Sequence, residues 1–314
     1  MHVEHREGYA LRASSFLKPI AHLCHQRWTQ GARLGLLFIG LQVQTLPTSA
    51  NIYVDNPNFL VDSLKYTQFS PIVELVSTHN VTKDGKTGIS QGTGFLVSPC
   101  YVLTAAHVIF GDNKHFDYDG DYTMILLIGK ITSGGFVTHV PVTPDMNLMS
   151  QRGSDDWAML KLPDDKCFGV HPKIGWYEAA ARSPRIGQSA LAVGFNINHP
   201  NLLSASIGSV RGVGGDDLIL YNGSFTGGAS GGPVFIKVEG VSRVAGIITT
   251  ARDEQRRSFH PTYVDVTANE FQSIDRILGN SAVKARLDAD KARFGNKNSA
   301  EQRMSQPWPQ RPKK

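Results

Sequence analysis

Short runs rich in β-branched and aromatic residues, bounded by Gly, Asn, Asp or Pro, follow one another along most of this chain. They form two sets, one on each side of Cys167. The first set comprises 71–77, 92–97, 101–104, 122–128, 136–142 and 157–162. The second comprises 190–195, 203–210, 217–221, 233–238, 243–249 and 262–266. Short strands joined by turns are typical of all-β sandwiches and barrels, so two sets indicate two barrels.

The 314 residues are 41% hydrophobic and 19% charged, which suffices for two compact cores. We expect the barrels to span 68–168 and 169–267, preceded by an arm over 51–67. A helical segment is expected over 268–291.

The expected helical segment rests on a capping box at 267–270, Thr-Ala-Asn-Glu. Phe271, Ile274, Ile277 and Leu278 then recur at helical spacing. Gly279 suits the position just after a helix.

Residues 1–50 have the pattern of a secretory signal. Arg27 and Arg33 lead into the apolar run 34–41, and small residues at 48–50 allow cleavage after Ala50. The apolar run is shorter than the roughly 20 residues of a membrane span. We expect a secreted or periplasmic protein with no stable membrane span once the signal is removed. A signal anchor is the alternative.

The positive charge of the chain lies at its ends. The formal net charge is +5, but residues 291–314 carry +6 and residues 1–50 carry +3, which leaves 51–290 at −4. The folded part is therefore mildly acidic, and nucleic-acid binding is not expected. The polar, proline-containing stretch 292–314 is predicted to be a disordered basic tail. A solvated tail is favoured over one that binds an acidic surface.

Ser230 lies in a run of eight residues, 226–233, that contains four glycines. Glycine permits a tight turn and close approach of a ligand, and the free N–H groups of such a turn can bind a developing oxyanion. A serine hydroxyl needs a base, and the base needs a carboxylate to hold its tautomer. His107, at the end of an apolar strand, and Asp156, at the start of another, are the candidates. Asp155 is an alternative acid.

Three segments together resemble the trypsin/chymotrypsin family of serine peptidases. They are Leu-Thr-Ala-Ala-His at 103–107, Asp-Trp-Ala-Met-Leu at 156–160 and Gly-Ala-Ser-Gly-Gly-Pro at 228–233. They stand in the family order, 49 and 74 residues apart, and the resemblance covers about 68–280. It is closest to the bacterial exported members.

The resemblance implies an all-β fold of two six-stranded antiparallel β-barrels, chymotrypsin-like, with a C-terminal helix. It implies that His107 is the general base and then the acid, that Asp156 orients it and that Ser230 is the nucleophile. The N–H groups of Gly228 and Ser230 would form the oxyanion hole.

Two departures from the family are informative. Ala229 replaces the aspartate that pairs with a liberated N-terminal amine, so we expect no activation of that kind. The usual disulfides are absent, but Cys100 and Cys167 are an even pair in an exported chain and flank adjacent strands of the first barrel. We expect a Cys100–Cys167 disulfide, with two buried thiols as the alternative.

The resemblance places the specificity pocket around five uncharged residues: Ser224, Thr249, Thr250, Ala251 and Tyr263. Ile248 stands where a histidine would favour acidic substrates. We therefore expect cleavage after small or medium uncharged residues.

The sequence thus predicts a serine endopeptidase with peptide or protein substrates, expected to be monomeric. No cofactor is expected. No metal site is expected either, because the remaining histidines lack partners at ligand spacing. The alternatives are a catalytically weak or inactive binding protein that keeps the fold, and an esterase that uses the same triad.

Overall fold

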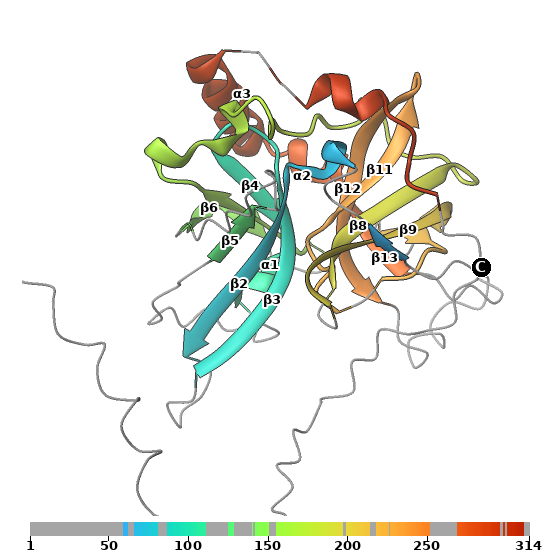
Figure 1. Ribbon diagram of the computed structural model, residues 1–314, viewed down its shortest axis with the longest axis horizontal. Helices are drawn as coiled ribbons and strands as arrows, with labels where there is room; N and C mark the ends of the chain where they lie inside the picture. Colours follow the sequence, from blue (N-terminus) through green and yellow to red (C-terminus); the bar gives the residue numbers. More distant parts are fainter. Residues whose placement is uncertain are drawn as a thin grey trace, which may run out of the picture. The chain divides into compact units, whose positions relative to one another are not determined.

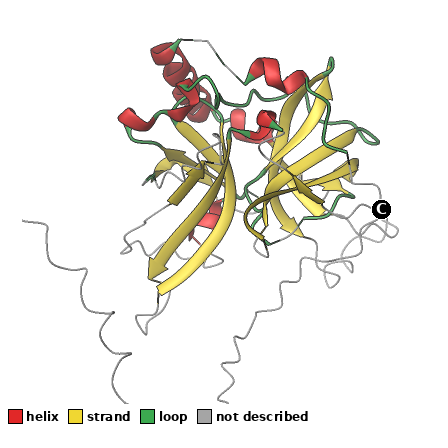
Figure 2. Ribbon diagram, viewed as in Figure 1, coloured by secondary structure: helices red, strands yellow, loops and turns green. Residues whose placement is uncertain are grey.

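Two antiparallel sheets make up most of the described part of the chain (Figures 1 and 2). The computed structural model describes residues 59–61, 66–80, 87–110, 125–128, 140, 142–150, 155–196, 199–213, 218–225, 227–251, 269–295, 298 and 300–310. The expected signal at 1–50 and the pocket residue Tyr263 lie outside these ranges.

The first sheet has six strands in the order β5-β2-β3-β4-β7-β6. They are β2 (Ile72–Asn80), β3 (Thr87–Leu96), β4 (Tyr101–Thr104), β5 (Ile125–Ile128), β6 (Thr143–Ser150) and β7 (Trp157–Lys161). Among the described residues, no pairing joins its outer strands β5 and β6.

The second sheet has seven strands in the order β1-β9-β10-β13-β12-β11-β8. They are β1 (Phe59–Val61), β8 (Ser189–Asn196), β9 (His199–Val213), β10 (Leu218–Tyr221), β11 (Pro233–Val238), β12 (Val241–Ala251) and β13 (Asn269–Ser273). Because β8 also pairs with β9, the six strands from β8 to β13 close into a barrel, and β1 from the N-terminal arm is added to β9. The predicted all-β fold is confirmed.

Aromatic side chains connect the two sheets. Tyr177, in the segment between them, packs its ring against Phe95 of β3 and edge-on against Phe235 of β11, with centroids 6.0 and 4.9 Å apart. Its hydroxyl donates to the Gln68 carbonyl at 2.8 Å. Burial raises the pKa of Tyr177 well above its usual value, so the phenol stays neutral and keeps this donor. Tyr177 therefore belongs to a core shared by both sheets.

The C-terminal helical segment begins later than the sequence indicated. Residues 269–273 form strand β13, helix α2 spans Ile274–Leu278 with Ser273 at its N-cap, and helix α3 spans Ser281–Phe294. Glu270 and Phe271 pair with both β10 and β12, so the capping-box interpretation of 267–270 is wrong for Glu270. Tertiary pairing overrides the local helix signal here.

The C-terminal tail also differs from the expectation of disorder. The stretch 300–310 includes the short 3-10 helix η5 (Glu301–Ser305), and both Ala300 and Met304 are buried. Trp308 Nε1 donates to Ser242 Oγ on β12 at 2.9 Å, and Gln68 Nε2 donates to the Pro307 carbonyl at 3.2 Å. The tail is held by specific side chains that average composition does not reveal.

None of the helices in the described ranges combines the length and apolar character that a membrane span requires.

Candidate active site

His107 lies in the first turn of helix α1 (Ala106–Phe110), just after strand β4. The strand residues are buried, and the small side chains of Ala105 and Ala106 are completely buried. Helix α1 packs closely on β3, because a Cβ on Gly92 would clash with the Val108 side chain. The histidine is thus fixed at the end of a buried strand, with its side chain 25% exposed.

Asp156 holds His107 through both of its carboxylate oxygens. Oδ2 lies 2.6 Å from His107 Nδ1, and Oδ1 accepts the His107 backbone N–H at 2.9 Å. Strands β4 and β7 pair antiparallel with Thr104 opposite Ala158, which brings Asp156, just before β7, next to the start of helix α1. The carboxylate selects the tautomer with the proton on Nδ1 and leaves Nε2 to accept a proton.

Asp155 has other partners. Its carboxylate pairs with Arg276 Nε at 2.7 Å and accepts from Gln272 Nε2 at 3.0 Å and from Ser150 Oγ at 3.2 Å. Gln272 also accepts the Asp156 backbone N–H at 2.9 Å. Among the contacts that the structure describes for the two neighbouring acids, those to His107 come from Asp156.

Ser230 lies in the turn that joins β10 to β11. Gly228 and Gly231 on either side have positive φ of 88° and 82°. A Cβ on Gly231 would clash with Thr104 Oγ1, so the turn lies against the strand that leads to His107. The N–H groups of Gly228 and Ser230 have no acceptor among the described residues. Both amides are therefore available as hydrogen-bond donors.

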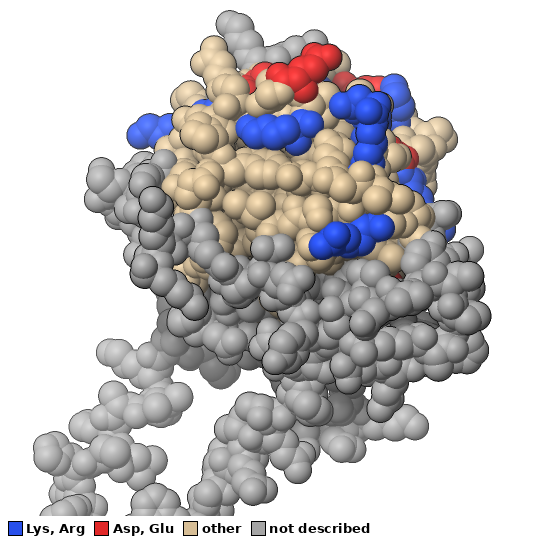
Figure 3. Space-filling view, turned by 90° about the vertical axis from the view of Figure 1, so that its right-hand side faces the viewer, with Lys and Arg blue, Asp and Glu red and all other residues tan. Residues whose placement is uncertain are grey.

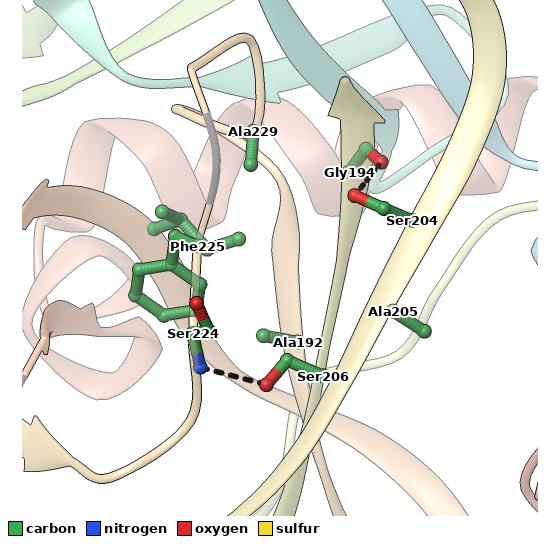
Figure 4. A pocket seen from close by; sticks show the side chains of 9 residues that line it. Ala192, Gly194, Ser204, Ala205, Ser206, Ser224, Phe225 and Ala229 are labelled. Carbon is green, nitrogen blue, oxygen red and sulfur yellow. Dashed lines mark hydrogen bonds between the residues drawn. The ribbon is translucent and has the colours of Figure 1, made fainter. Parts of the chain in front are cut away.

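The predicted pocket residues are only partly brought together. Ser224 lines a small, partly open cavity behind the turn, with Ala192, Gly194, Ser204, Ala205, Ser206, Phe225, Ala229 and Ile248 (Figure 4). The Ser224 N–H donates to Ser206 Oγ at 2.8 Å, and Ser204 Oγ lies 3.3 Å from the Gly194 carbonyl. Among the described residues, no charged side chain lines this cavity.

The other pocket residues lie elsewhere or outside the description. Thr249 is buried on β12, and its Oγ1 has no hydrogen-bond partner in the described part of the chain. Thr250 and Ala251 pair with Glu270 and Asn269 of β13 through their backbones. The side-chain positions of these two residues are outside the described part.

A disulfide joins Cys100 and Cys167, as expected, with a Cα–Cα distance of 4.3 Å. Cys100 immediately precedes β4, and Cys167 follows β7. The Leu162 N–H also donates to the Cys100 carbonyl at 2.9 Å. The disulfide therefore ties together the far ends of the two strands that deliver His107 and Asp156.

Sequence reasoning did not identify Thr93, Gln272 or Arg276 as part of this site. Their partners are far away in sequence: 135 residues separate Thr93 from Gly228, and 116 separate Asp156 from Gln272. No local motif marks such contacts. Among the described residues, no group of three or more His, Cys, Asp or Glu could hold a metal ion.

Residues 92–247 match the family model described as the trypsin-like peptidase domain. His107, Asp156 and Ser230 all fall within this range. The chain therefore contains a trypsin-like peptidase domain and is a serine endopeptidase.

Two solved structures are similar to this chain. The active form of the Rv3671c protease from M. tuberculosis is 19% identical, with a TM-score of 0.47, and the match covers 74% of this chain and 90% of that one. The serine endoprotease from Yersinia pestis is 18% identical, with a TM-score of 0.46, and the match covers 73% of this chain and 68% of that one. A comparison with curated protein sequences gives no match.

Proposed function

We propose that this chain is an exported endopeptidase that hydrolyses peptide bonds with Ser230, His107 and Asp156 as its catalytic triad. The observation that carries the proposal is the double contact between Asp156 and His107 beside the Ser230 turn. This arrangement holds the base in one tautomer at the end of strand β4, the strand against which the Ser230 turn packs.

The reaction follows from these groups. Ser230 Oγ attacks the carbonyl carbon of the substrate while His107 Nε2 takes the hydroxyl proton. The resulting oxyanion accepts hydrogen bonds from the N–H groups of Gly228 and Ser230. His107 then gives its proton to the leaving amine, the C–N bond breaks, and an acyl-Ser230 ester remains. Water attacks this ester with His107 again acting as the base, which releases the acid and regenerates the serine.

We expect cleavage after small or medium uncharged residues. The described residues that line the cavity beside Ser224 carry no charge that could pair with Lys, Arg, Asp or Glu in a substrate. On the face in Figure 3, the described Lys and Arg side chains stand in separate groups among mostly uncharged residues.

Activation by a liberated N-terminus is not expected, because Ala229 has no carboxylate to pair with an amine. Activity should therefore be the same with and without extra residues ahead of Asn51. Strict dependence on a new N-terminus would contradict this part of the proposal. Export through a signal at 1–50 fits the Cys100–Cys167 disulfide, since disulfides persist in oxidising compartments.

A peptide library tests the proposal, with wild-type protein and Ser230→Ala compared side by side. We expect wild type to cleave peptides after Ala, Val, Ser or Leu, and the Ser230→Ala variant to lose at least about 10³-fold in kcat/KM. Dominant cleavage after Arg, Lys or Glu would contradict the specificity. Hydrolysis of small esters but not of peptides would identify an esterase. A folded protein that cleaves neither would be identified as a binding protein.

A further inference from the structure

Thr93, on strand β3 of the first sheet, makes four hydrogen bonds that connect it to three other segments. Its N–H donates to the Ser230 carbonyl at 2.8 Å, and its Oγ1 donates to the Gly228 carbonyl at 2.7 Å. Its Oγ1 also accepts the Phe195 N–H at 2.8 Å, and its carbonyl accepts from Thr104 Oγ1 at 2.7 Å. The residue is completely buried.

The Thr93 hydroxyl both donates and accepts a hydrogen bond. A threonine hydroxyl has one proton to donate and two lone pairs to accept. Here the Phe195 N–H of strand β8 occupies a lone pair, and the proton goes to the Gly228 carbonyl. A buried chain of this kind has one low-energy arrangement, because breaking either bond leaves a buried backbone group unpaired.

Both carbonyls that Thr93 holds lie in the turn that would bind the oxyanion. The peptide planes that begin at Gly228 and Ser230 are fixed by their carbonyl oxygens. Between them lies the Ala229–Ser230 peptide, whose N–H is one of the two proposed donors. The Ala229 carbonyl of this peptide accepts the Gly232 N–H at 2.9 Å. With both flanking planes held as well, its N–H cannot turn away from the substrate at low cost.

We propose that the Thr93 hydroxyl is a positioning group that keeps the 228–230 turn in its oxyanion-binding conformation. It performs this role from the other sheet, in a chain that has no carboxylate at position 229. The inference rests on the proposed function, because it takes Ser230 as the nucleophile. Thr93 does not contact the substrate and is a positioning residue.

Thr93→Val is the most direct test, because valine keeps the shape and the backbone N–H but removes the hydroxyl. We expect kcat to fall about 10- to 100-fold, somewhat less than the loss of an oxyanion donor itself, while KM changes less than about threefold. Thr93→Ser restores the hydroxyl, so its kcat should lie within about threefold of wild type. Each rate is divided by the concentration of active sites determined by titration. The measurements are made below the melting temperature of every variant.

Ser98→Ala is the matched control. The Ser98 hydroxyl is also completely buried and donates to Asp290 Oδ2 at 2.6 Å, away from the triad. Its loss should lower the melting temperature and leave kcat unchanged. If Thr93→Val does not fold, Thr93→Ala and Thr93→Ser are compared, and serine should exceed alanine at least tenfold in kcat.

A Thr93→Val variant with wild-type kcat overturns the inference, and so does a Thr93→Ser variant as slow as Thr93→Val. Both results leave the proposed function standing as long as Ser230→Ala is inactive. An active Ser230→Ala variant would instead refute the proposed function itself.

Discussion

At the scale of single residues, two adjacent carboxylates have separate sets of partners. Asp156 uses both oxygens on His107, whereas Asp155 pairs with Arg276 and Gln272. Adjacent residues of an extended segment point to opposite sides, so one acid faces α1 and its neighbour faces β13 and α2. Because the two carboxylates are adjacent but have different partners, each can serve as the control for mutation of the other.

We predict that Asp156→Asn lowers kcat by about 10³- to 10⁴-fold, because an amide can donate to Nδ1 and stabilises the wrong tautomer of His107. Asp155→Asn should keep kcat within about tenfold of wild type and lower the melting temperature by a few degrees, through loss of its ion pair with Arg276. Steady-state kinetics with thermal unfolding of both variants provides the comparison. Equal losses of kcat in the two would contradict the assignment of Asp156.

The sequence predicted the local part of this site and not its supports. His107, Asp156 and Ser230 each stand in a distinctive local pattern, with small residues before a histidine, an acid before an apolar strand and glycines around a serine. Thr93 and Gln272 look ordinary in sequence, since an internal Thr or Gln suits any strand. Their importance depends on contacts between the two sheets, and these exist only once the chain has folded.

At the scale of elements, strand β13 was expected to be helical and instead completes the barrel between β10 and β12. The helical spacing was real only from Ile274 onward, where α2 begins. The strand carries Gln272, which is 1% exposed and links Asp155 and Asp156 to the second sheet. This element therefore supports Asp156, the acid of the proposed triad.

We expect Gln272→Leu to reduce kcat roughly tenfold, because the Asp156 backbone and the Asp155 carboxylate both lose a buried partner. Gln188→Leu is the control: its Oε1 also accepts a backbone N–H, from Arg185, and its Nε2 donates to the Lys237 carbonyl, away from the triad. Measured kcat should separate the two variants. A wild-type kcat in Gln272→Leu would show that Asp156 needs no support from β13.

At the scale of the whole molecule, the described stretch 300–310 of the tail is an ordered part of the fold. Arg243 of β12 donates twice to the Glu301 carboxylate, at 2.7 and 2.5 Å, and Lys237 of β11 donates to the Met304 and Gln306 carbonyls. The Lys237 ammonium also lies 5.7 Å from the centre of the Trp308 ring. A composition of Pro, Gln, Lys and Arg suggested disorder, but a few anchoring side chains outweigh the average. The strand pattern, by contrast, recurs from residue 71 to residue 266, and the all-β fold was readable from it.

A chain that ends at Phe294 should lose about 3 kcal/mol of unfolding free energy, since Ala300, Met304 and Trp308 lose their packing. Its melting temperature should fall by about 6–12 °C, and its kcat at low temperature should stay near wild type. A chain that ends at Gln310 is the control and should melt like wild type. Unchanged melting of the shorter chain would contradict the ordered tail.

The central claim is that Ser230 is a nucleophile activated by His107. Reaction with a fluorophosphonate, followed by intact-mass measurement and peptide mapping, tests it most directly. The account predicts one adduct per chain, located on Ser230, absent in Ser230→Ala and formed at least about 10³-fold more slowly in His107→Ala. No adduct on folded wild-type protein, or an adduct on a different residue, would contradict it.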